Sequence, residues 1–287
     1  MHVDIRIKII TALLAMVPLS ANAEIDANVE TVAQINYEPY SGVAGAAELP
    51  LTVTNSGTVP MQLQVEIRPQ STSGFIFERT ALPVRLQFDG RENNLERLAF
   101  PTSIEAETTS VLKIDCLVDA AQFAESGEDT LTVDIEVFDA STSTLVASLQ
   151  AVDINLNVAP HAQMSIAGAL GGQAGSRNFM LVDFGEMESN EEESIQIRIQ
   201  ANTDAEVTIS SENNGRMVHD SRPDLSADYS IIFDGQMSEL ASDLVVIRRP
   251  ASVFAGTSYP LTFILGDTTQ LFEGTYRDFV TIDVEAQ

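Results

Sequence analysis

Residues 271–287 read LFEGTYRDFVTIDVEAQ, and their side chains alternate in character after the turn at Gly274. One face carries the apolar side chains of Tyr276, Val280, Ile282 and Val284, while the other face is mostly polar. A period of two predicts a half-buried β-strand. A strand with so clear a pattern should have a neighbour on each side. Since the sequence ends here, we expect a β domain that lacks its final strand.

The same phrase occurs earlier in the chain. Thr132–Glu136 reads TVDIE and aligns with TIDVE at Thr281–Glu285. There the chain continues through a polar turn into a further alternating run, which holds Val152, Ile154, Leu156 and Val158 on one face. Two asparagine-led turns repeat as well, with Asn55 lying 77 positions before Thr132 and Asn202 lying 79 before Thr281. These repeats predict an all-β protein of two tandem immunoglobulin-like β-sandwiches, the second lacking its final strand.

The first 23 residues have the pattern of an export signal. Arg6 and Lys8 give a basic start, Ile9–Val17 is a short apolar core, and Ala21-Asn22-Ala23 is a small-residue cleavage site. Nine apolar residues are too few to span a bilayer. We therefore expect the protein to be exported.

Charge and cysteine content narrow the function classes. The net charge is −27, and removal of residues 1–23 leaves 13 basic and 41 acidic residues, or −28. A charge of this sign excludes nucleic acid and anionic membranes as partners. The single cysteine, Cys116, cannot form an intramolecular disulfide, and its alternation with Leu112 and Ile114 predicts a buried, inert thiol.

Turn residues divide the rest into two β-rich parts. Residues 24–158 hold at least seven strand-like runs, and Pro160 follows the last of them, so we expect an N-terminal sandwich at 24–158 and a C-terminal one at 159–287. In the first part, Phe75, Ile76 and Phe77 follow a polar loop. They are either an exposed adhesive tip or ordinary core residues.

Residues 160–287 resemble the subunits of archaic chaperone/usher pili, the spore coat U-like fimbrial family. The resemblance rests on Asp183-Phe184-Gly185, on Ser211–Met217 (SENNGRM) and on Gly274–Ile282 (GTYRDFVTI). It implies a sandwich without its last strand, into which a periplasmic chaperone and later a neighbouring pilus subunit insert a strand. Tyr276, Val280, Ile282 and Val284 would flank the donor-strand groove.

Two departures from this family affect the interpretation. The family's early cysteines are absent, and a complete domain precedes the incomplete one. The second departure resembles a two-domain tip adhesin, so the resemblance implies a non-enzymatic adhesive pilus subunit that is exported through the periplasm to the cell surface. Its partners would be a chaperone, an outer-membrane usher, a strand-donating subunit and an unidentified surface or receptor.

The residues offer little for catalysis or metal binding. After the signal only His161 and His219 remain as histidines, and we expect His219 to be solvent-exposed rather than a ligand. The motifs of serine hydrolases and P-loops are absent. We therefore expect no enzymatic activity, cofactor or metal. Two alternatives remain: an exported two-domain sandwich that binds carbohydrate or protein outside any pilus, and a calcium-dependent surface module.

Overall fold

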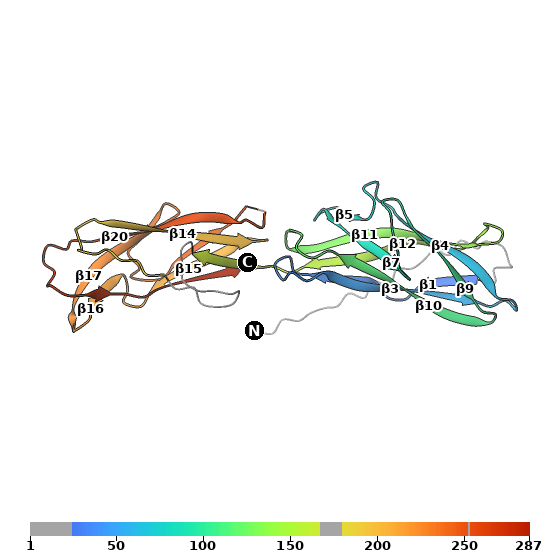
Figure 1. The fold of residues 1–287 in the computed structure, drawn as a ribbon, viewed down its shortest axis with the longest axis horizontal. Coiled ribbons are helices and arrows are strands. Elements are labelled where there is room, and N and C mark those ends of the chain that lie inside the picture. The colour runs from blue at the N-terminus through green and yellow to red at the C-terminus, as the bar shows by residue number, and fades with distance from the viewer. Residues whose placement is uncertain (1–24, 167–179, 252) are drawn as a thin grey trace.

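The computed structural model describes residues 25–166, 180–251 and 253–287. The predicted export signal at residues 1–23 lies outside this part of the chain. Every regular element in the described ranges is a strand, which confirms the all-β prediction. The strands form two sandwiches that lie end to end, as Figure 1 shows. Within these ranges there is no helix long and apolar enough to cross a membrane.

The N-terminal sandwich consists of two five-stranded sheets. The first has the order β1 (Ile25–Val29), β3 (Gly45–Asn55), β10 (Thr108–Val118), β7 (Arg85–Phe88) and β8 (Arg91–Glu92). The second has the order β2 (Ala33–Tyr37), β12 (Leu145–Val158), β11 (Gly127–Asp139), β4 (Met61–Pro69) and β9 (Leu98–Ile104). A short hairpin adds β5 (Ile76–Phe77) and β6 (Leu82–Pro83). All neighbours are antiparallel except β2, which runs parallel to β12.

The C-terminal sandwich has one larger and one smaller sheet. The larger has the order β13 (Ala162–Ile166), β14 (Glu192–Ala201), β20 (Thr257–Leu265), β17 (Arg222–Phe233), β16 (Arg216–His219) and β21 (Tyr276–Arg277), with β18 (Gln236–Ser238) on β17. The smaller contains β19 (Leu244–Arg248), β15 (Ala205–Ser211) and β22 (Val280–Ala286). All of these pairings are antiparallel.

The two sandwiches share one plan. The order β1-β3-β10-β7 corresponds to β13-β14-β20-β17, and β9-β4-β11 corresponds to β19-β15-β22. Asn55 ends β3 and Asn202 directly follows β14, while Thr132 and Thr281 occupy the corresponding strands β11 and β22. The repeat that the sequence predicts is therefore present in the fold. It also shows the difference between the halves: β11 lies beside β12, whereas no described strand lies on the corresponding side of β22.

Each sandwich has its own apolar core because alternate side chains of its strands point inward. In the N-terminal sandwich the inward residues of β11 are at most 2% exposed, namely Leu131, Val133, Ile135 and Val137. Cys116 is also fully buried, and this burial, reinforced by the Asp115 carboxylate, raises the pKa of its thiol to about 12. The thiol therefore stays protonated at neutral pH.

The joint between the sandwiches is short and bonded on both sides. The chain passes from β12 to β13 through residues 159–161. The side chain of Asn202 donates to the carbonyl of Ala159 (2.9 Å) and accepts from the N–H of His161 (2.7 Å). Phe254 packs edge-on against two N-terminal rings at 5.5 and 5.9 Å between centroids, those of Tyr40 and Phe123. These contacts connect the two sandwiches across the joint.

Candidate functional site

The unpaired edge of β22 is the first candidate site. On its other side β22 pairs with β15, and the pairing extends to the carbonyl of Phe279 and the N–H of Gln287, whose bonds measure 2.9 and 2.8 Å. Backbone groups of an antiparallel strand alternate between its two sides. Val280, Ile282 and Val284 therefore direct their N–H and C=O groups away from β15. No strand among the described residues takes up these groups.

The side chains of the same three residues are half-buried against the C-terminal core. Their counterparts in the complete sandwich differ: Val133 and Ile135 on β11 are fully buried, because β12 closes that side of the sheet. The TVDIE and TIDVE segments thus have the same alternation, but the inward side chains of the second are less buried. A strand beside β22 would bury the remaining apolar area.

The opposite wall of this opening is β13. Its pairing with β14 includes a bond from the N–H of Asn202 to the carbonyl of His161 (3.1 Å), so the backbone groups of Met164 and Ile166 point away from β14. Both side chains are half-buried against the same core, and Cα atoms of β13 and β22 approach within 8 Å. We call the set Met164, Ile166, Val280, Ile282 and Val284 the open flank. The β13 residues were not among those predicted from the sequence, although their alternation is visible in it.

Tyr276 lies outside the open flank. It belongs to β21, which pairs with β16 in the other sheet, and it is 9% exposed. The predicted strand is interrupted at Asp278, where the chain crosses from one sheet to the other. Tyr276 instead packs edge-on against His219, with 5.0 Å between ring centroids.

Asp278 fixes this crossing. Its carboxylate accepts hydrogen bonds from the hydroxyls of Ser211 (2.6 Å) and Tyr229 (2.5 Å), and from the backbone N–H (3.1 Å) and side-chain amide (2.9 Å) of Asn213. Burial, together with the bond to this carboxylate, raises the pKa of the Tyr229 phenol. Asp278 therefore joins the two sequence motifs, SENNGRM and GTYRDFVTI, and positions the start of β22.

His219 is 7% exposed, so the expectation that it faces solvent is wrong. Its ring lies over Gly274, where a Cβ atom would overlap the imidazole. The ring nitrogen Nδ1 accepts from the N–H of Ser221 (3.2 Å). His219 thus has a packing role beside β21. In the described ranges no group of three His, Cys, Asp or Glu side chains is arranged to hold a metal ion.

The apolar loop of the N-terminal sandwich is mostly core. Phe75 and Phe77 are 3% and 0% exposed, so the expectation of an exposed aromatic tip is wrong for both. The physical reason is that the β5–β6 hairpin turns these rings inward, where they join the N-terminal core. Ile76 is half-exposed between them.

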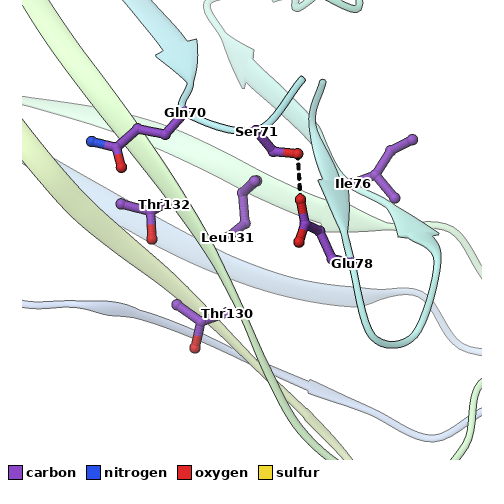
Figure 2. A pocket seen from close by; sticks show the side chains of 7 residues that line it. All are labelled: Gln70, Ser71, Ile76, Glu78, Thr130, Leu131 and Thr132. Atoms are coloured by element: carbon purple, nitrogen blue, oxygen red, sulfur yellow. Dashed lines mark hydrogen bonds between the residues drawn. The ribbon is translucent and has the colours of Figure 1, made fainter. Parts of the chain in front are cut away.

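Ile76 borders a shallow hollow of about 260 Å³, shown in Figure 2, which we call the proximal notch. Its lining is Gln70, Ser71, Ile76, Glu78, Thr130, Leu131 and Thr132. The polar groups there already have partners within the protein. The Ser71 hydroxyl donates to Glu78 (2.6 Å), the Gln70 amide donates to Asp134 (2.8 Å), and Thr132 donates to Asp153 (2.8 Å).

A second hollow, of about 300 Å³, lies on the outer face of β4 and β11, and we call it the distal notch. Its lining is Gln64, Glu66, Arg68, Phe138, Asp139, Ala140 and Ser143. It borders the β11–β12 turn, which lies at the end of the N-terminal sandwich away from the joint (Figure 1). No local pattern in the sequence predicts this hollow, because β4 and β11 are distant in the chain.

No protein-family model matches the sequence, and no curated protein is similar to it in sequence. Among solved structures, the chain aligns with one chain of the CsuC–CsuE chaperone–tip adhesion subunit pre-assembly complex, with a TM-score of 0.47 and 14% identity. That complex comes from the archaic chaperone–usher Csu pili of Acinetobacter baumannii. The alignment covers 91% of this chain and 100% of that one.

Two further structures align over a similar length. The CupB6 tip adhesin from Pseudomonas aeruginosa has a TM-score of 0.41 and 9% identity, covering 91% of this chain and 93% of that one. A chain from the chaperone–tip adhesin complex of CFA/I fimbriae has a TM-score of 0.38 and 11% identity, covering 90% and 98%. The solved structures that this chain resembles thus include chaperone–tip adhesin complexes of pili.

Proposed function

We propose that this protein is a non-enzymatic adhesive subunit of a surface pilus and that it joins its fibre by accepting a donor strand at the open flank. The observation that carries this proposal is the difference between two equivalent strands. β11 is covered by β12, whereas no strand in the described ranges pairs with the outer edge of β22, where Val280, Ile282 and Val284 are half-buried. Strand addition supplies both missing elements, main-chain hydrogen bonds and alternate apolar side chains.

The open flank also supports a requirement for a chaperone. An unpaired edge above half-covered apolar side chains is a template for uncontrolled pairing with other chains. A strand lent during export would protect it until assembly. The proposed partners are therefore a periplasmic chaperone, an outer-membrane usher and a neighbouring subunit that donates the final strand, after export to the cell surface.

The N-terminal sandwich supplies a model for the donor. β12 is antiparallel to β11, with Val152 opposite Val133 and Ile154 opposite Leu131. The alignment of TVDIE with TIDVE makes Ile282 the counterpart of Val133. A donor strand that occupied the place of β12 would therefore put its counterpart of Val152 opposite Ile282. We therefore expect the donor to run antiparallel to β22 and to place apolar side chains at alternate positions.

In this proposal the complete N-terminal sandwich, residues 24–158, contacts the target surface or receptor. The C-terminal sandwich, residues 159–287, attaches the protein to the fibre. The short joint and the ring contacts of Phe254 would hold the binding domain at a fixed angle to the fibre. Phe75 and Phe77 have no part in this role, because both are buried.

The experiment uses residues 24–287, purified from the periplasm, and a synthetic peptide with the sequence of residues 147–156 (ASLQAVDINL). The matched control peptide replaces Leu149, Val152 and Ile154 by serine. We expect the first peptide, and not the control, to raise the melting temperature and to slow hydrogen exchange at the amides of Ile282 and Val284, which face the open edge.

Two results would overturn the proposal. One is a monomeric, cooperatively unfolding protein on which both peptides and a co-expressed chaperone have no effect. The other is protection of the amides of Thr281 and Asp283, which face β15, without protection of those at Ile282 and Val284. The first result would favour a binding protein that works outside any pilus.

A further inference from the structure

We propose that the distal notch is a binding site for one neutral hexose residue of a saccharide. This inference rests on the adhesive role proposed for the N-terminal sandwich and names the ligand class. The experiment reads binding at the notch itself, so its failure would leave strand addition at the open flank untouched.

Two groups in the distal notch are free to contact a ligand. The side-chain amide of Gln64 forms no hydrogen bond with any residue that the structure describes, and the ring of Phe138 is half-exposed with no aromatic neighbour in those ranges. The two residues are directly opposite each other on β4 and β11. An aromatic face beside an amide suits a pyranose ring, which presents C–H groups on one face and hydroxyls at its edge.

The charged groups of the notch are held in fixed positions. The carboxylate of Glu66 is 13% exposed and lies between two guanidinium groups, those of Arg68 (2.6 Å) and Arg97 (3.1 Å). Arg68 also approaches Glu136 (3.6 Å). Such a pre-formed array can exchange hydrogen bonds with hydroxyls without reorganising.

Asp139 adds an acceptor at the turn. Its Oδ1 atom accepts from the hydroxyl (2.7 Å) and the N–H (2.8 Å) of Ser141, which fixes the carboxylate and the β11–β12 turn. Its Oδ2 atom has no hydrogen-bond partner in the described part of the chain. One carboxylate oxygen is thus available to a ligand hydroxyl at the end of the molecule that would meet a target.

The charge balance selects a neutral ligand. Two guanidinium groups face three carboxylates around the notch, those of Glu66, Glu136 and Asp139, and both guanidinium groups are already paired. With a chain charge of −27, an anionic sugar would be repelled. The volume of about 300 Å³ accommodates a single hexose. The proximal notch is less suitable, since its Ser71, Gln70 and Thr132 side chains already have partners within the protein and its lining has no aromatic residue.

The test is a titration of the isotopically labelled mature chain, followed by amide NMR. The probes are methyl α-mannoside, methyl β-galactoside and N-acetylglucosamine, each up to about 20 mM, a concentration that nearly saturates a site with a Kd of about 1 mM. We expect at least one probe to shift the amides of Gln64, Phe138 and Ala140. N-Acetylneuraminic acid, the anionic probe, should shift them less.

Variants make the assignment specific. Phe138→Ala and Gln64→Leu should each weaken the response about tenfold or more, whereas Phe279→Ala, which removes an exposed ring from the C-terminal sandwich, should leave it unchanged. Gln64→Leu keeps the volume of the side chain, so it remains informative if Phe138→Ala fails to fold. The proposal is overturned if none of the neutral probes shifts these amides, if both variants respond as the unmodified protein does, or if the anionic probe binds best.

Discussion

Replacing Ile282 by alanine should weaken donor-peptide binding about fivefold while costing the free protein little. Full burial of an isoleucine side chain is worth about 1.5–3 kcal/mol. Ile282 is already half-buried in the described structure, so about 1 kcal/mol remains to be gained when a strand covers it. Since 1.4 kcal/mol corresponds to a tenfold change in Kd, this loss corresponds to about fivefold.

The assay is calorimetric titration with the 147–156 peptide, combined with thermal unfolding of the free variant. Ile135→Ala is the matched control, because Ile135 is a fully buried isoleucine on the equivalent strand β11, three positions beyond Thr132. It should destabilise the N-terminal sandwich by about 2–5 kcal/mol and leave peptide affinity unchanged. The reasoning fails if Ile282→Ala binds the peptide as tightly as the unmodified protein, or if it destabilises the free protein as much as Ile135→Ala does.

Three further predictions concern the supporting structure. Gly215 and Gly235 both have φ of +79°, but a Cβ at Gly215 would overlap a neighbouring carbonyl whereas Gly235 faces open space. In chemical denaturation, Gly215→Ala should lower the free energy of unfolding by at least about 3 kcal/mol and Gly235→Ala by about 1–2 kcal/mol. Asn202→Ala leaves two backbone groups at the joint without their partner, so it should lower the free energy of unfolding by about 1–3 kcal/mol and broaden the inter-domain motion seen by X-ray scattering. Unchanged scattering and unchanged stability would contradict this prediction. Burial and the bond to Asp278 raise the pKa of the Tyr229 phenol, so the stability that the protonated phenol contributes to the folded state is complete below pH 10, the ordinary tyrosine value, and is lost as the pH rises further. Above pH 10 the free energy of unfolding should therefore fall more steeply in the unmodified protein than in Tyr229→Phe. Parallel curves for the two proteins would refute this.

The fold could be predicted from the sequence because its main signals are local. Period-two alternation around Thr132 and Thr281 identifies the strands, and the recurrence of TVDIE as TIDVE relates the two sandwiches without any knowledge of their contacts. An alternating run follows the first copy and predicts β12, the strand that covers one side of β11. Val280, Ile282 and Val284 lie on β22, the strand that the alternation predicts, and no described strand pairs with its outer edge.

The rest depends on contacts between distant segments. Tyr276 shares the alternation of β22 but lies in the other sheet, because Asp278 bonds to Ser211 and redirects the chain. A short apolar run such as Phe75–Phe77 can have the same composition in a core as on a surface. Its burial here follows from the β5–β6 hairpin, which turns the two rings inward. The distal notch depends on the register of β4 against β11, which no local pattern specifies.

The joint also determines how the molecule carries tension. β12 runs along the N-terminal sandwich and leaves it towards β13 after three residues, so a pull between the distal notch and the open flank acts along its axis. The ladders to β11 and β2 are then loaded in shear, and many hydrogen bonds must break together rather than one after another. Unfolding under load is governed by the height of this barrier. Because the protein has one cysteine, which is buried, no disulfide within the chain shares that load, and the resistance to pulling depends on the ladders of β12.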